Sequence, residues 1–318
     1  MIAAHADWSM DPRKRWLTWA RWTQGQWRAA APEPVGDLPA LLPRLLRPGL
    51  PVALGLDLPL GLPRAYAAAR PESGFPDFLH GLAARPEFFV VNAGLETVAA
   101  ASPFYPARGI AGMTRAAHAA ALGLAGPQDL SRWCDRATAE RPAGAPLFWT
   151  LGANQSGKAA ITAWRDWLLP ALGSGAPIRL WPFEGGLHAL LAPGCAVLAE
   201  VYPAEALRHC GLKLAGSKRV VSARQALAPA LLAAMVARQV VPDPALEAAV
   251  RTGFGADAAG EDRFDSVIGL LGLIGVLDGI RPDFVPADPW IRRWEGWVLG
   301  QTALPRLPGV EPDRVGLP

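Results

Sequence analysis

The chain has 318 residues, of which 51% are hydrophobic and 19% are charged. This apolar content is enough for a sizeable core and excludes a wholly disordered chain, and the length predicts one large domain or two. The 33 glycines and 32 prolines show no period, which excludes collagen and predicts many turns. The formal net charge of +3 is only mildly basic, so the composition permits a phosphate-bearing partner without requiring one.

Cysteine usage and hydropathy indicate the compartment. The three cysteines are odd in number and widely spaced, so they form no disulfide framework and favour a reducing environment. Asp7 and the charged segment 11–15 interrupt any apolar run of signal-peptide length. The longest apolar run, residues 267–277, is too short to cross a bilayer. We therefore expect a cytoplasmic protein with no membrane partner.

The N-terminal residues predict a β-meander. Residues 2–8 form a short apolar run, and residues 15–22 alternate after a turn at 11–14. A second turn at 24–25 lets residues 26–30 return as a third strand. Short strands joined by such turns are typical of antiparallel pairing.

The meander is followed by a helix and a buried strand. Leucines at helical spacing predict a helix over residues 36–46. Residues 51–58 are a continuous apolar run that holds one charge, Asp57, which favours a strand buried on both faces. Residues 64–148 are rich in Ala, Pro and Arg and carry few motifs, so we expect a helical insertion there. A Pro-rich tail covers residues 305–318.

Strands and helices alternate in the second half of the chain. Strands are expected over residues 147–151, 178–181 and 196–202, and helices over residues 158–172, 219–239 and 262–277. This alternation, after the meander, predicts a single α/β domain over residues 1–318, with a mixed sheet flanked by helices.

Acidic residues stand late in three apolar strands: Asp7, Asp57 and Glu200. A charge inside an apolar strand is costly unless it is paired or binds a metal. Each acid alone is equally well explained by a loop cap or a partner arginine. Three converging carboxylates instead indicate a divalent cation between them, and hard oxygen ligands suit Mg²⁺ or Mn²⁺.

A further acidic pair begins the last predicted helix. Asp262 and Asp265 are three residues apart and therefore share a helix face. An acid in the first helical turn commonly caps the helix, and this role explains Asp262. Asp265 shares its face with Gly269 and Gly272, whose lack of side chains lets the helix lie close against the sheet. We therefore expect Asp265 to point into the carboxylate cluster.

Two basic features lie between these acids. Residues 152–158 read Gly-x-x-x-x-Gly-Lys, close to a nucleotide-binding P-loop, but Ala159 replaces the hydroxyl residue that ligates Mg²⁺. We therefore predict no P-loop there, and Lys158 is either a surface residue or a contact for substrate phosphate. Lys218 and Arg219 belong to a stretch without acids, which is either a solvated helix face or a phosphate-binding surface beside the carboxylates.

Several sequence blocks together resemble a prokaryotic family of predicted ribonuclease-H-like nucleases, catalogued as a domain of unknown function. The blocks are Leu56-Asp57-Leu58-Pro59-Leu60-Gly61-Leu62-Pro63, Trp181-Pro182-Phe183-Glu184-Gly185, Glu200-Val201-Tyr202-Pro203, Asp262-x-x-Asp265 and the segment 152–158. The resemblance implies a ribonuclease-H-like mixed five-stranded sheet with an Asp in the first strand, an acid in the fourth and an acid on the last helix. Asp7, Asp57 and Asp265 occupy these places.

The acids and the resemblance together predict a hydrolase, a metal-dependent nuclease that cleaves phosphodiester bonds of a nucleic acid. Asp7, Asp57 and Asp265, with Glu200 or Asp262 as a fourth ligand, would hold two Mg²⁺ or Mn²⁺ ions about 4 Å apart. One ion would activate water and the other would stabilise the leaving oxygen. Two alternatives stay open: an ATPase or phosphotransferase of the actin-like branch, and a binding module that has lost turnover.

Overall fold

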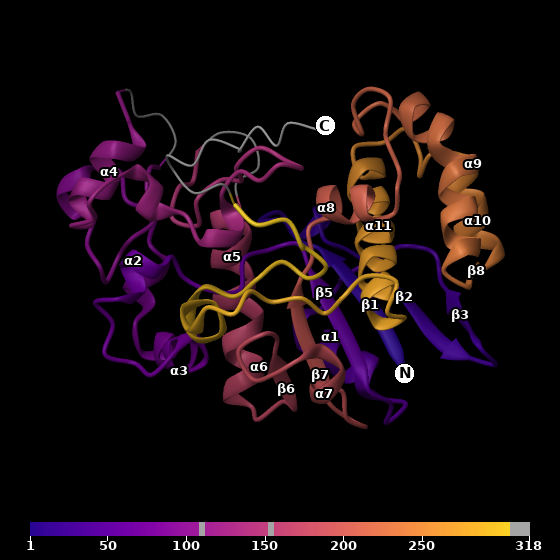
Figure 1. Cartoon of the computed structure of the whole chain (residues 1–318), viewed down its shortest axis with the longest axis horizontal. Helices are drawn as coiled ribbons and strands as arrows, with labels where there is room; N and C mark the ends of the chain where they lie inside the picture. Colours follow the sequence, from indigo (N-terminus) through magenta and orange to yellow (C-terminus); the bar gives the residue numbers. More distant parts are fainter. Residues whose placement is uncertain (108–111, 152–155, 306–318) are drawn as a thin grey trace, which may run out of the picture.

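The computed structural model describes residues 1–107, 112–151 and 156–305. Its strands are β1 (Ile2–Asp7), β2 (Trp16–Thr23), β3 (Gln26–Ala29), β4 (Glu33–Pro34), β5 (Val52–Leu56), β6 (Ile178–Leu180), β7 (Ala196–Glu200) and β8 (Val240–Pro242). Within these residues they form one eight-stranded sheet in the order β6-β7-β5-β1-β2-β3-β8, with β4 paired to β2. The α/β architecture with a mixed sheet and flanking helices is confirmed (Figure 1), but the sheet has eight strands where five were expected.

Helices surround the sheet and fill the connection after β5. Around the sheet lie α1 (Leu38–Leu46), α5 (Ser156–Ala163), the π-helical turn η7 (Trp164–Leu168), α6 (Leu169–Gly173), α7 (Leu187–Leu190), α8 (Pro203–His209), α9 (Val221–Ala237), α10 (Pro244–Arg251), α11 (Gly260–Leu277) and the π-helical turn η8 (Ile291–Glu295). After β5 come α2 (Arg64–Ala67), α3 (Phe75–Gly81) and α4 (Arg115–Ala121), with 3₁₀ turns η2 (Leu82–Ala84), η3 (Pro86–Phe89), η4 (Leu95–Thr97), η5 (Pro127–Leu130) and η6 (Trp133–Asp135). The turn η1 (Pro12–Lys14) joins β1 to β2.

The strand pairing brings three strand ends to one edge of the sheet. β1, β2 and β3 form the predicted antiparallel meander, and Gln24 and Gly25 take positive φ in the tight turn between β2 and β3. β1 pairs parallel with β5, and β5 pairs parallel with β7. In these ladders Ala6 lies opposite Leu56, and Leu56 lies opposite Glu200. The carboxyl ends of β1, β5 and β7 therefore lie side by side.

The two faces of the sheet bury different cores. Side chains alternate along a strand, so neighbours in sequence point to opposite faces. Leu54 and Leu198 lie in the core that includes α1 and α5. Ala53 and Val197 lie in the core that includes α9 and α11. In β1, β5 and β7, odd-numbered residues thus face α11 and even-numbered residues face α5.

Helix α11 crosses the sheet at a glycine, as predicted. A Cβ atom at Gly269 would lie 2.2 Å from Cε1 of the His5 ring, so only glycine lets the helix lie this close to β1. A Cβ atom at Gly55 of β5 would lie 2.9 Å from the same ring. Gly272 faces a different neighbour, because a Cβ atom there would lie 2.5 Å from the Cβ atom of Ala206 in α8. Gly269 therefore allows close packing of α11 against the sheet, and Gly272 allows close packing against α8.

The connection after β5 shares the core of the sheet. Phe78, Phe88 and Phe104 belong to the same buried cluster as the residues of β5 and β7 on the α5 side. In Figure 1 this segment, drawn in purple and magenta, lies at the opposite end of the molecule from α9 and α10. Its short helices and turns therefore pack onto the sheet through these residues, and a smaller cluster of Val98, Tyr105 and Trp149 lies within the segment itself.

One expected element is wrong and others were missed. The expected strand over residues 147–151 is absent from the described sheet; that segment makes one isolated bridge, between Tyr105 and Trp149. Its apolar residues are buried by packing, since Phe148 contacts Phe104 at a ring separation of 5.3 Å. A short apolar run of this kind does not distinguish a strand from other buried backbone. The elements β8, α8 and α10 were not predicted.

We predict that Gly269→Ala destabilises the protein by about 1–3 kcal/mol, because the added methyl group forces the helix away from His5. Gly275→Ala on the same helix is the matched control, since its Cβ atom would lie 3.7 Å from Arg238. Ala favours a helix interior over Gly by about 1 kcal/mol, so the control should be neutral or stabilising. Urea denaturation of both variants measures the difference. Equal stability of the two variants would contradict the close packing.

Candidate functional site

Carboxylates from three elements gather where β1 and β5 end. Asp7 is the last residue of β1, and Asp57 directly follows β5. The backbone N–H of Asp57 donates to the carbonyl of Ala6 at 3.1 Å, which continues the parallel ladder up to the two acids. Their carboxyl groups also share a hydrogen bond. Asp265, in the second turn of α11, is buried and adds its charge to both.

Burial and mutual repulsion raise the pKa of all three acids. The pKa of Asp7 rises well above its ordinary value through burial and then through the charges of Asp265 and Asp57. The pKa of Asp57 rises to about 7 through burial and then through the charge of Asp265, while Lys218 and the hydrogen bond with Asp7 lower it. The pKa of Asp265 rises to about 6 through burial, although the neighbouring Lys218 lowers it. Burial is the largest cause in each case, and a bound cation would offset it by favouring the ionised carboxylates.

Lys218 places a positive charge against the carboxylate cluster. Its Nζ donates to Oδ2 of Asp265 and lies 3.3 Å from Oε1 of Glu261. Burial lowers the pKa of Lys218, but Asp265 and Asp57 raise it by more, so the ammonium stays charged. Arg219, predicted beside it, points outward with 81% of its side chain exposed and lies 3.4 Å from Glu261. Of the two predicted basic residues, only Lys218 reaches the carboxylates.

Asp262 lies at the margin of the cluster. Its Oδ2 atom is buried and has no hydrogen-bond partner among the described residues. Its charge contributes to the raised pKa of Asp7, so the two carboxyl groups are near one another. Burial is the main cause that raises the pKa of Asp262 itself. The residue expected to be a simple helix end thus carries a buried carboxylate oxygen without a partner among the described residues.

Glu200 stands at the same sheet edge but on the other face. It lies opposite Leu56 in the ladder, and even-numbered residues of β5 and β7 face the α5 side. Nη1 and Nη2 of Arg132 each donate to its carboxylate at 2.6 Å. The backbone N–H of Leu60 donates to it at 2.9 Å. The geometry therefore does not bring Glu200 together with Asp7 and Asp57, although its charge contributes to the Asp57 pKa.

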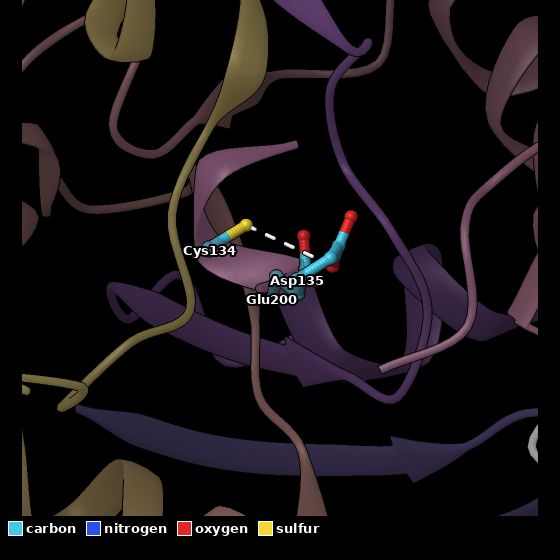
Figure 2. Close-up of side chains that lie close together, drawn as sticks. All are labelled: Cys134, Asp135 and Glu200. Atoms are coloured by element: carbon cyan, nitrogen blue, oxygen red, sulfur yellow. Dashed lines mark hydrogen bonds between the residues drawn. The ribbon is translucent and has the colours of Figure 1, made fainter. Parts of the chain in front are cut away.

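Cys134, Asp135 and Glu200 offer potential ligand atoms within 4.8 Å of one another (Figure 2). Arg132 fills the space between the two acids, because its Nε and Nη2 atoms also donate to Asp135 at 2.9 Å each. All four carboxylate oxygens accept from this one guanidinium. Burial raises the pKa of the Cys134 thiol, which keeps it neutral. We therefore interpret this group as an ion-pair network rather than a metal site.

The carboxylates of Asp7, Asp57 and Asp265 do not all lie within 4.8 Å of one another, although those of Asp7 and Asp57 share a hydrogen bond. In the part of the chain that the structure describes, the other set of potential ligands within 4.8 Å is Glu140, Glu205 and His209. This spacing of the carboxylates is compatible with ligands that are divided between two ions. It is also expected of carboxylates that repel one another when no ion lies between them.

A pocket of about 380 Å³ opens beside the cluster. Asp57 and Lys218 line it, together with Ser156 at the start of α5. The rest of the lining comes mainly from two segments, residues 141–145 of the insertion and residues 202–208 around α8. Asp57 is therefore reachable from solvent through a cavity of ligand size, whereas Asp7 and Asp265 lie behind its lining.

Lys158 lies in the first turn of α5 and is half-buried. Residues 152–155, which hold most of the P-loop-like motif, lie outside the described residues, so the prediction that this motif binds no nucleotide stays a prediction.

Comparisons with other proteins leave the family open. No protein-family model matches the chain, and searches of the curated proteins and of the solved structures found no match. The resemblance to ribonuclease-H-like nucleases therefore stays a prediction. Among the helices of the described residues, none is both long and apolar enough to cross a membrane.

We predict that the metal-free protein loses stability as the pH rises from about 4 to 7. The folded-state pKa of Asp57 lies near 7, above that of the unfolded chain, so its contribution is fully present at low pH and is lost as the carboxyl ionises. Asp57→Asn should remove part of this loss and raise the free energy of unfolding at pH 7.5 by at least about 1 kcal/mol. Asp37→Asn, at an exposed carboxylate, is the control. Urea denaturation in EDTA at pH 4.5, 6 and 7.5 measures the free energy of unfolding of both variants. If the stability of Asp57→Asn falls with pH as steeply as that of the wild type, the carboxylate cluster is contradicted.

We predict that Arg132→Met destabilises the protein by about 3–5 kcal/mol, since it leaves Glu200 and Asp135 buried and unpaired. Adding Glu200→Gln to this variant should recover part of the loss by removing one uncompensated charge. Arg251→Met, which breaks the exposed pair with Glu247 at 2.6 Å, should cost less than about 1 kcal/mol. The measurement is the denaturation midpoint of the wild type, the single variant, the double variant and the control. A small effect of Arg132→Met would show that the ion-pair network is not needed for stability.

Proposed function

We propose that the chain hydrolyses phosphodiester bonds of a nucleic acid with the help of Mg²⁺ or Mn²⁺. The observation that carries this proposal is the cluster of two buried carboxylates, Asp7 and Asp265, with the half-buried Asp57 beside a solvent-accessible pocket. Such a cluster is electrostatically costly for a chain that has no cation to bind there. Its position at the carboxyl ends of parallel strands is also a common place for a ligand in an α/β protein.

The residues present fit a divalent cation in their chemistry. The three carboxylates supply the hard oxygen ligands that Mg²⁺ and Mn²⁺ prefer. The buried Oδ2 atom of Asp262, without a partner among the described residues, offers one more oxygen near Asp7. We propose Asp7, Asp57 and Asp265 as ligands and Asp262 as the fourth. Glu200, bound by Arg132, then acts as a support for the loop after β5 rather than as a ligand.

The side chains of the protein position the proposed ligands, supply a positive charge at Lys218 and release protons when a cation binds. Asp7 and Asp57 are held by the sheet, and Asp265 is held by the packing of α11 on β1. Bound ions would supply an activated water and a counter-charge for the leaving oxygen. Ligand carboxylates must be ionised, so the raised pKa values mean that binding releases protons near neutral pH. With the carboxylates neutralised, Lys218 becomes available to a substrate phosphate.

The order of elements supports the same interpretation. The meander β1, β2 and β3 is followed by β5 and β7, which pair parallel with β1 and with each other. Counted along these five central strands, Asp7 lies in the first and Asp57 follows the fourth, while Asp265 lies on a late helix. These are the places that the resemblance to ribonuclease-H-like nucleases implies for its acids.

The test is hydrolysis of bis(p-nitrophenyl) phosphate, DNA and RNA with Mn²⁺. We predict activity that EDTA abolishes, and a loss of at least about 100-fold in Asp265→Asn, since even outer-shell partners of metal ligands are worth about 10- to 100-fold. Asp262→Asn should have a smaller effect. A second measurement is the melting temperature, which Mn²⁺ should raise in the wild type but not in Asp265→Asn. Full activity of Asp265→Asn, or activity that resists EDTA, would contradict the proposal.

A further inference from the structure

The ammonium group of Lys218 already takes up part of the proposed cation site. Its Nζ donates to Oδ2 of Asp265, and its charge lowers the pKa of Asp7, Asp57 and Asp265. Lys218 lines the pocket together with Asp57, whereas its partner Asp265 is buried. The lysine therefore occupies one of the two oxygens that Asp265 offers to a cation.

The backbone of Lys218 is fixed, whereas its side chain has room to move. Nη1 of the buried Arg224 donates to the carbonyl of Lys218, and the same guanidinium donates to the carbonyls of Gly253 at 2.7 Å and Gly255 at 2.6 Å. The side chain of Lys218 is nevertheless 43% exposed. A flexible four-carbon stem lets an ammonium group change its partner while the backbone stays in place.

A second carboxylate lies next to the first on α11. Glu261 is four residues before Asp265, so the two side chains share a helix face. Oε1 of Glu261 lies 3.3 Å from Nζ of Lys218. The side chain of Glu261 is 24% exposed and that of Asp265 is 7% exposed, so Glu261 is the more accessible partner. An ammonium group that moved from Asp265 to Glu261 would keep an ion pair and leave Asp265 free.

A divalent cation on Asp265 would drive this move. Like charges a few ångströms apart in a partly buried site repel strongly, so the ion and the ammonium group exclude each other from one carboxylate. Two positive charges also offset the repulsion among the acids better than one does. The ion is therefore favoured at the cluster when it is present, and the lysine is favoured when it is absent.

We propose that Lys218 is an internal competitor for the cation site, which pairs with Asp265 in the metal-free protein and moves to Glu261 when Mg²⁺ or Mn²⁺ binds. This inference rests on the proposed metal-dependent function and describes how the same site is regulated. The lysine stabilises the metal-free cluster and, for the same reason, lowers its affinity for the ion.

Mn²⁺ titrations followed by the electron paramagnetic resonance of free Mn²⁺ measure this competition without turnover. We expect Lys218→Met to bind Mn²⁺ about tenfold more tightly than the wild type, since the ion no longer breaks a charged hydrogen bond. In EDTA the same variant should unfold at a lower urea concentration, because the acids lose a countercharge. Lys213→Met, at an exposed lysine of the same segment, is the matched control and should change neither value.

A double-mutant cycle separates the move to Glu261 from a general effect of charge. If Glu261 receives the lysine, Glu261→Gln should weaken Mn²⁺ binding about threefold or more in the wild type, but less than about twofold in Lys218→Met. If Glu261 acts on the ion only through its charge, the loss of affinity is the same in both backgrounds.

Two results would overturn the inference. One is Mn²⁺ binding to Lys218→Met that is no tighter than binding to the wild type. The other is an equal effect of Glu261→Gln in the two backgrounds. In both cases the proposed function survives if the wild type binds Mn²⁺ and Asp265→Asn does not. If the wild type leaves the signal of free Mn²⁺ unchanged and cleaves no diester, the proposed function fails together with the inference.

Discussion

The ring of His5 sets the distance between α11 and the sheet. It fits between Gly269 of the helix and Gly55 of the neighbouring strand, and its Nε2 atom lies 3.1 Å from the carbonyl of Val201. Burial lowers the pKa of His5 to about 4, so the ring is neutral at physiological pH and adds no charge beneath the acids. Asp7 lies two residues further along β1, and Asp265 lies one turn earlier on α11. The distance between the carboxylates of Asp7 and Asp265 therefore depends on the packing of the His5 ring against Gly269.

Hydrogen bonding of the acids differs between the two sides of the sheet edge. On the α5 side, the guanidinium of Arg132 donates to all four carboxylate oxygens of Glu200 and Asp135, although burial still raises the pKa of Glu200. On the α11 side, the ammonium group of Lys218 donates to Asp265, and Oδ2 of Asp262 has no partner among the described residues. A complete network stabilises a fold, whereas an incompletely compensated one has capacity for a further cation. This contrast, rather than the number of acids, distinguishes the candidate site from the structural network.

The sequence predicted the elements whose signal is local. Alternation and turn residues predicted the meander, and the glycines of α11 predicted its close approach at Gly269. The strand over residues 147–151 failed because burial by aromatic packing produces the same apolar run as a strand. The role of Glu200 could not be predicted, because its partner Arg132 lies 68 positions away in a segment without motifs.

The position of Arg132 has a consequence for the architecture of the chain. A long connection between strands is commonly treated as a removable module, and residues 64–148 invite such treatment. Yet this connection supplies the guanidinium that neutralises the end of β7, and Nη1 of that guanidinium lies 3.3 Å from the carbonyls of both Leu60 and Glu295. Excision would strip the sheet of an internal counterion and disconnect the loop after β5 from η8. The connection is thus an integral part of the domain, and a shortened chain would need a new cation at the place of Arg132.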